Sequence, residues 1–217
     1  MTKILIAGAT GLIGKQVAKK LANVGDLHII SRRAVEDLPL SVHQHIIDPR
    51  KWPDAIATIS ADIAISCLGT TWNNSGKNEA AFRAVDLDLV LMFASAARKA
   101  GARHMISVSS VGASAKSSNF YLRTKGEAEN GLKRQEFGRL DILHPGLLRG
   151  QRGGDRRLGE HIAIIASPFT DALLHGPLRR YRSIESATVA DAIANLAMKG
   201  GQGLFIHEND AISTLAG

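Results

Sequence analysis

Residues 3–14 read "KILIAGATGLIG", and this stretch decides the fold of the chain. An apolar run of strand length ends at Ala7, and Gly8, Gly11 and Gly14 follow as an amphipathic run begins. Glycines at such a junction let the backbone turn tightly and approach a pyrophosphate, which then rests on the helix N-terminus. The stretch therefore predicts the first strand and helix of a dinucleotide-binding sheet.

The rest of the chain continues this alternation. Apolar runs of strand length occupy 27–33, 42–48, 61–69, 104–110, 140–146 and 203–208. Helical spacing of apolar residues is found at 13–25, 52–60, 79–101, 119–130, 156–167 and 189–200. Strands that alternate with helices are typical of a parallel sheet covered on both faces. We predict a single α/β domain with a doubly wound, mostly parallel sheet of Rossmann type. Its dinucleotide-binding core would span 1–150, and a small helical substrate region with the last strand would span 151–217.

The amino-acid composition restricts the classes of protein to which this chain can belong. The chain has 217 residues, of which 45% are hydrophobic, which suits one well-buried domain. Cys67 is the only cysteine, which excludes an internal disulfide and fits a reducing compartment. No apolar run approaches the ~20 residues of a membrane span, and the first residues make a poor signal peptide. We therefore expect a cytoplasmic protein that does not bind membranes.

The net charge of +7 raises the question of an anionic partner. Arginines gather late in the chain, at 149, 152, 156, 157, 179, 180 and 182. No nucleic-acid motif accompanies them, and no aromatic residues are interleaved for base stacking. We expect a solvated basic face and no nucleic acid, with a surface that attracts a phosphate-bearing ligand as the alternative.

The end of the second strand bears on the choice of cofactor. NAD-binding proteins usually carry an acidic residue about 20 residues past the glycine loop, bonded to the ribose 2′-hydroxyl. Here the strand ends with Ser31, Arg32 and Arg33. Two guanidinium groups can bind a 2′-phosphate, and no carboxylate is present to repel it. The pattern favours NADP(H) over NAD(H), although two arginines after a strand can also be simply exposed.

Three patterns together resemble the short-chain dehydrogenase/reductase superfamily. They are the glycine spacing, "SVSS" at 107–110, and Tyr121 followed four residues later by Lys125. Within it, "SSVGASAKSSNFYLRTKGEAE" (109–129) and "HPGLLRG" (144–150) look like the atypical members related to the Tat-interacting protein. The resemblance covers nearly the whole chain and implies an NADP(H)-dependent oxidoreductase acting on a small carbonyl or alcohol substrate. A sugar nucleotide is less expected, because little chain is left for a substrate domain.

The resemblance also implies roles for single residues. Tyr121 would be the catalytic acid or base, Lys125 would bind the nicotinamide ribose and lower the tyrosine pKa, and Ser110 would orient the carbonyl, with Ser109 as the alternative. The implied cofactor contacts are Gly8, Thr10, Gly11, Leu12, Ile13, Gly14, Arg32, Arg33, Asp48, Cys67, Leu68, Gly69, Thr70, Tyr121, Lys125, Pro145, Leu147 and Leu148.

The chemistry explains why these residue types are needed. Reducing a carbonyl requires a hydride at carbon and a proton at oxygen, and a free phenol with a pKa of ~10 is a reluctant donor at neutral pH. A nearby ammonium favours the phenolate, and a serine hydroxyl can hold the same oxygen.

Two departures from the family pattern concern proton transfer. Asp86 stands where many relatives place an asparagine, and the separation of Ser110 from Tyr121 is somewhat shorter than in the best-known branch. The runner-up function is a non-catalytic NADP(H)-binding sensor or scaffold that acts through protein partners. A homodimer or a protein partner also stays open.

Other residues carry weaker signals. The histidines at 104, 144, 161 and 175 show no metal-binding spacing, so no metal site is expected. Cys67 is expected to be a small strand-end residue and not a nucleophile. Trp72 lies in a polar stretch that is either a plain loop or one wall of a substrate pocket.

Overall fold

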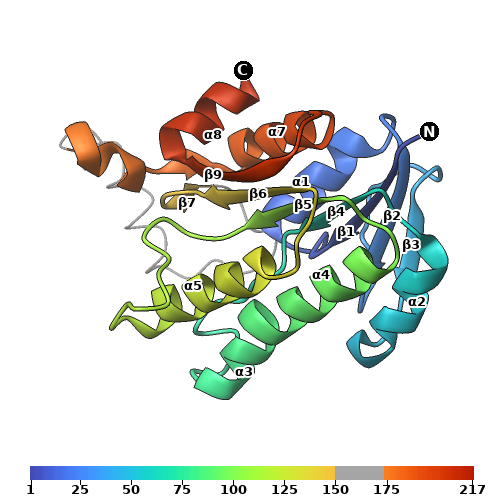
Figure 1. Cartoon of the computed structure of the whole chain (residues 1–217), viewed down its shortest axis with the longest axis horizontal. Helices are drawn as coiled ribbons and strands as arrows, with labels where there is room; N and C mark the ends of the chain where they lie inside the picture. Colours follow the sequence, from blue (N-terminus) through green and yellow to red (C-terminus); the bar gives the residue numbers. More distant parts are fainter. Residues whose placement is uncertain (150–173) are drawn as a thin grey trace.

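The computed structural model describes residues 1–149 and 174–217 and contains a seven-stranded sheet with helices on both faces (Figure 1). The strands of this sheet are β1 (Lys3–Ala7), β2 (Asp26–Ser31), β3 (His43–Ile46), β4 (Ile63–Ser66), β5 (His104–Val108), β6 (Arg139–His144) and β9 (Gly203–Glu208). Their order is β3-β2-β1-β4-β5-β6-β9, and every pairing is parallel. The fold class predicted from the sequence is confirmed.

This strand order places the ligand-binding crevice. The chain runs outward from β1 to β3 and then returns, so that β4 pairs with the other side of β1. Ligands of open α/β sheets bind outside the carboxyl ends of the strands where the order reverses. The glycine loop after β1 and the loop after β4 both lie at this point.

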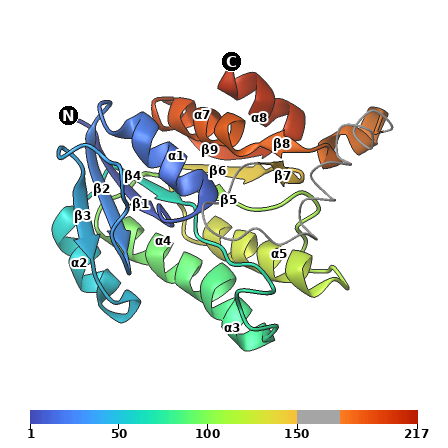
Figure 2. The same ribbon diagram turned by 180° about the vertical axis from the view of Figure 1, so that it is seen from behind.

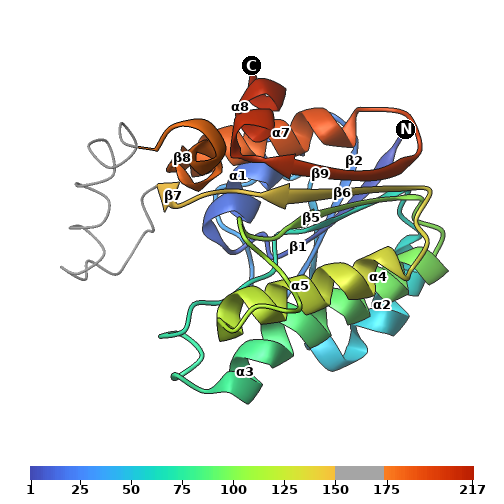
Figure 3. The same ribbon diagram turned by 60° about the vertical axis from the view of Figure 1, so that its left-hand side comes forward.

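Helices cover the two faces of the sheet unequally (Figure 3). One face carries α1 (Leu12–Leu21), α7 (Ser186–Ala197) and α8 (Asn209–Ala216), and the other carries α2 (Trp52–Ile59), α3 (Glu79–Arg83), α4 (Val90–Lys99) and α5 (Phe120–Lys133). Figure 2 shows α1 and α7 lying side by side, and the two helices are in extensive contact.

Two apolar cores separate these layers. Ile4 and Ile6 of β1 point into the core under α1 and α7, whereas Leu5 and Ala7 point into the core under α2 and α4. Because both faces of the central strands are buried, these strands appear in the sequence as continuous apolar runs and not as alternating ones.

The long helix expected at 79–101 is present but is not regular. A π-helical turn, η2 (Ala84–Leu89), lies between α3 and α4. Such turns insert one extra residue into the helical ladder and are frequent at functional sites.

The C-terminal part differs in detail from the expectation. β9 completes the sheet, and α7 and α8 cover it beside α1. The helix α8, the short strand pair β7 (Leu148–Arg149) and β8 (Ile184–Glu185), and the 3-10 helix η3 (Gly176–Tyr181) were not expected from the sequence. The helix predicted at 156–167 lies outside the described residues.

Candidate cofactor and catalytic site

The glycine loop has the geometry that the sequence predicts. Gly8 follows β1 directly and has φ of +85°, and a Cβ there would collide with the backbone of Cys67. A Cβ at Gly14 would collide with the carbonyl of Gly8. Gly11 is the N-cap of α1, and its amide donates to the Gly8 carbonyl at 3.0 Å. The loop therefore folds tightly against β4 and leaves the first amides of α1 available to an anion.

The other residues predicted in this loop differ in exposure. Thr10 is exposed and Leu12 is half-buried, so both can face a bound cofactor. The side chain of Ile13 belongs to the core under α1, so this residue can offer a cofactor only its backbone.

Arg32 and Arg33 are exposed beyond the end of β2, and neither guanidinium makes an ion pair within the described residues. The hydroxyl of Ser31 donates to the carbonyl of Arg33 at 2.6 Å, which holds the turn that carries both arginines. Two exposed guanidinium groups thus lie just beyond the carboxyl end of β2.

Asp48 begins the 3-10 helix η1 (Pro49–Lys51), at the carboxyl end of β3. Its carboxylate accepts from the backbone and the guanidinium of Arg50, and these bonds lower its pKa to about 2. Both carboxylate oxygens of Asp48 already accept hydrogen bonds from Arg50. The adenine contact implied by the resemblance stays a prediction.

The central finding concerns Lys125. Its Nζ lies 2.7 Å from Oδ1 of Asp86, and Oδ2 of Asp86 accepts from the amide of Thr70 at 2.8 Å. Asp86 is 1% exposed and Lys125 is 7% exposed. Burial lowers the pKa of Lys125, but the charges of Asp86 and Tyr121 raise it, and its net pKa is above the ordinary value. The lysine is therefore a fixed, buried ammonium.

The π turn explains how Asp86 reaches this position. Asp86 lies within η2 and is buried there. Its carboxylate joins the loop after β4 to the helix that carries Tyr121 and Lys125. Gly69 lies beside this pair, since a Cβ there would lie 3.4 Å from Asp86 Oδ1 and 3.6 Å from Lys125 Nζ.

Tyr121 and Lys125 stand on the first turns of α5. Asn119 caps this helix by accepting from the amide of Leu122 at 3.1 Å. Tyr121 is 39% exposed, and its ring packs edge-on against Phe82 at 5.8 Å. Its ring is therefore held in place while part of the side chain reaches solvent.

Aromatic rings extend from Tyr121 toward the loop after β4. Phe120 packs edge-on against Phe82 at 5.6 Å and against Trp72 at 5.8 Å. Trp72 is 43% exposed. Its contact with Phe120 joins the loop after β4 to the start of α5.

The structure distinguishes the two candidate serines. Ser109 is buried, and its hydroxyl donates to Glu129 in a short hydrogen bond. Ser110 is half-buried, and within residues 1–149 and 174–217 its hydroxyl has only a long contact of 3.4 Å with the carbonyl of Val111. Ser110 is thus the serine whose hydroxyl is available to a substrate.

Sequence reasoning missed the network behind Ser109. Glu129 is 5% exposed and also accepts from Nε2 of His144 at 2.7 Å. A cavity of about 10 Å³, the size of one water, lies between this network and the Asp86–Lys125 pair. The i+4 spacing from Lys125 to Glu129 on α5 was the available signal.

The segment after β6 contains the last predicted cofactor contacts. Pro145 is buried, and Leu147 and Leu148 are at least partly exposed. Gly146 donates to Oδ1 of Asn209 at 3.1 Å, and a Cβ on it would collide with the carbonyl of Arg182. This packing fixes the segment at the carboxyl end of β6.

Two further expectations concern the reactivity of Cys67 and the late arginines. Burial raises the pKa of the Cys67 thiol to about 12, which fits a strand-end residue and not a nucleophile. The late arginines that the structure describes all have partners: Arg149 with Glu185, Arg179 with Asp210, Arg180 with Glu208, and Arg182 with the carbonyl of Leu174.

The fold and this crevice define a Rossmann-type NAD(P)-binding protein. The chain belongs to the NAD-dependent epimerase/dehydratase family, which matches residues 4–131. It is 35% identical to the mitochondrial protein fmp52 of Emericella nidulans, over 94% of this chain and 90% of the relative. It is 32% identical to protein HTATIP2 of Rattus norvegicus, over 96% and 87%. The resemblance to the Tat-interacting protein family is confirmed.

Solved structures agree on the fold. A UDP-glucose 4-epimerase from Thermotoga maritima, determined with UDP-glucose, superposes with a TM-score of 0.71 at 17% identity, over 95% of this chain and 77% of that one. MoeE5 in complex with UDP-glucose and NAD gives 0.71 at 15% identity, over 94% and 75%. Identities this low show the fold alone.

One prediction is wrong on these findings. The cytoplasmic location expected from the sequence is contradicted by relatives from three fungi that are named as mitochondrial proteins. In residues 1–149 and 174–217, no helix is long and apolar enough to cross a membrane.

Proposed function

We propose that this protein is an NADP(H)-dependent oxidoreductase that transfers a hydride between the nicotinamide and a small carbonyl or alcohol substrate. The single observation that carries the proposal is the buried ion pair between Lys125 and Asp86, with Lys125 one helical turn after the exposed Tyr121 on α5. The same ammonium would bind the nicotinamide ribose in a scaffold too, so it is the phenol of Tyr121, on the same helix as Lys125, that distinguishes an enzyme from a scaffold.

Each residue of the site has its own role in the proposed proton transfer to the carbonyl oxygen. Tyr121 gives its phenolic proton to the carbonyl oxygen as the hydride supplied by the bound cofactor reaches the carbon. The charge of Lys125 stabilises the phenolate that forms, and Asp86 keeps this ammonium in place. The hydroxyl of Ser110 donates to the same oxygen and fixes its orientation.

The preference for NADP(H) rests on the end of β2. Arg32 and Arg33 are exposed, unpaired within the described residues and held by the Ser31 turn. Arginine binds phosphate with paired, charge-assisted hydrogen bonds. The family is NAD-dependent by name, so discrimination between the two cofactors would come from these side chains.

A deuterium-transfer experiment tests the proposal. Purified protein is incubated with NADPH deuterated at the transferred position and a panel of small aldehydes and ketones, and deuterium in the alcohol product is measured by mass spectrometry. Deuterium transfer from NADPH, and at least about tenfold less from NADH, is expected, which corresponds to about 1.4 kcal/mol. Tight NADPH binding with no transfer to any carbonyl would favour the sensor or scaffold instead.

A further inference from the structure

A group of polar side chains lies at the opposite end of the sheet from the cofactor site. Asp26 and His28 come from the start of β2, and His43 and His45 come from β3. His28 and His43 are direct partners in the parallel ladder. Because side chains two apart on a strand share a face, all four lie on one face of the sheet.

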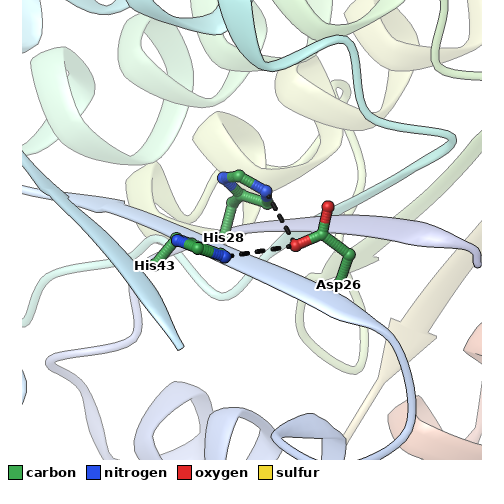
Figure 4. A group of neighbouring side chains, drawn as sticks. All are labelled: Asp26, His28 and His43. Atoms are coloured by element: carbon green, nitrogen blue, oxygen red, sulfur yellow. Dashed lines mark ion pairs between the residues drawn. The ribbon is translucent and has the colours of Figure 1, made fainter. Parts of the chain in front are cut away.

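Three atoms of this group converge on a small volume (Figure 4). Nε2 of His28 lies 3.1 Å and Nε2 of His43 lies 3.5 Å from Oδ1 of Asp26. All three atoms lie within 4.8 Å of one another. Ligands bound at about 2.0–2.1 Å in a tetrahedron stand roughly 3.3 Å apart. The two distances to Asp26 are therefore those of neighbouring ligands around one ion.

The hydrogen bonding of His28 favours this arrangement. Its Nε2 is buried and makes no hydrogen bond within the described part of the chain, even though Oδ1 of Asp26 is close. A buried ring nitrogen without a hydrogen bond requires an explanation. A metal ion bound at Nε2 would satisfy this nitrogen.

His45 supplies the contact that orients such a ligand. Its Nε2 lies 2.9 Å from Nδ1 of His28, and the two rings stack at 5.2 Å. Donation from His28 Nδ1–H to His45 leaves the lone pair of His28 Nε2 free. Metal-binding histidines typically donate their other ring N–H in this way.

The charges nearby are compatible with a cation at this point. Lys3 lies on the far side of the carboxylate, with Nζ at 3.9 Å from Oδ2 of Asp26. Nζ of Lys3 also donates to the carbonyl of Ile59 at 3.0 Å, which directs it away from Oδ1.

We propose that Asp26, His28 and His43 bind one divalent transition-metal ion of the zinc class, with water in the fourth position. Two imidazoles and one carboxylate suit Zn²⁺ and its neighbours better than Mg²⁺ or Ca²⁺. The four residues of β3 bury little side-chain surface, so an ion that joins β2 to β3 would hold this edge strand in place. The histidines considered in the sequence, at 104, 144, 161 and 175, are not part of this site.

Cobalt binding is the test, because Co²⁺ in a tetrahedral site absorbs strongly in the visible. Tag-free protein is stripped with a chelator and titrated with Co²⁺. One equivalent should bind with saturation, Zn²⁺ should displace it, and the melting temperature should rise with metal. His43→Gln should weaken binding at least about 100-fold, since even residues behind the ligands contribute 10–100-fold. His45→Phe keeps a ring but removes the acceptor and should cost about tenfold.

The controls separate this site from adventitious binding. His175→Gln changes another exposed histidine and should bind Co²⁺ like the wild type. The side chain of His43 is 60% exposed, so His43→Gln should fold normally by circular dichroism, and Asp26→Asn gives a second, isosteric variant. The proposal is overturned if no saturable one-to-one binding occurs, or if both His43→Gln and Asp26→Asn retain it.

Discussion

Lys125 of α5 and Asp86 of the π turn η2 form a buried ion pair 2.7 Å long, and the second oxygen of Asp86 binds the amide of Thr70. One carboxylate thus connects the loop after β4, the irregular helix and the helix of Tyr121. Because this contact is buried, it fixes the position of Lys125 relative to the loop after β4.

Asp86→Ala should destabilise the protein by about 3–5 kcal/mol, because it leaves the ammonium of Lys125 buried without its partner. Asp86→Asn keeps an acceptor for Thr70 and should cost less. Denaturant unfolding of both variants measures the difference. Asp88→Ala, on the exposed side of the same turn, is the matched control and should stay within about 0.5 kcal/mol. Equal losses at positions 86 and 88 would contradict the account.

Gly8→Ala should both destabilise the fold, by about 2–5 kcal/mol, and abolish tight cofactor binding. Its φ is +85°, and the new Cβ would collide with the backbone of Cys67, so the loop must move. Gly76→Ala is a sharp control, because Gly76 also has a positive φ of 66° but open space around it. It should cost about 1–2 kcal/mol and leave binding unchanged. Unfolding and fluorescence titration with NADPH check both expectations.

Replacing Arg32 and Arg33 together by alanine should raise the dissociation constant for NADPH at least about 150-fold, because each guanidinium would lose at least one charge-assisted hydrogen bond of about 1.5–3 kcal/mol. The affinity for NADH, which has no 2′-phosphate, should change little. Arg134→Ala removes an exposed arginine elsewhere and controls for net charge. Calorimetric titration with both cofactors measures the ratio, and a loss that is the same for both would exclude the proposed role.

Asp141 should make stability sensitive to acid. Burial alone would raise its pKa, but bonds from His104, His207 and Arg139 hold the pKa of this carboxylate far below its usual value. A group with a depressed folded pKa contributes stability above its unfolded pKa of about 3.9 and loses it as the pH falls further. The free energy of unfolding of the wild type should therefore fall steeply below about pH 4. Asp141→Asn should be less stable at neutral pH and show a shallower acid slope.

The sequence predicts the fold well because the informative signals are local. Buried parallel strands such as β1 and β4 appear as short apolar runs, and Gly14 is needed for a close contact with the backbone of Gly8, six residues before it. Tyr121 and Lys125 share one helix face, so their relation also follows from spacing.

The features that were missed depend on distant contacts. The bond between Glu129 and His144 joins α5 to the end of β6, and only the parallel register brings them together. The same holds for His28 and His43, whose pairing depends on how β3 aligns with β2. The apolar spacing at 79–101 predicts one regular helix and does not distinguish the π turn at 84–89.

The most direct test of the central claim compares Tyr121→Phe with Tyr181→Phe, since these are the only two tyrosines in the chain. NADPH affinity and single-turnover oxidation of bound NADPH by a carbonyl substrate are measured for each. We predict that Tyr121→Phe still binds NADPH but reduces the carbonyl at least about 100-fold more slowly, as expected for loss of a general acid, while Tyr181→Phe stays active. Undiminished turnover in Tyr121→Phe would contradict the assignment of Tyr121 as the proton donor.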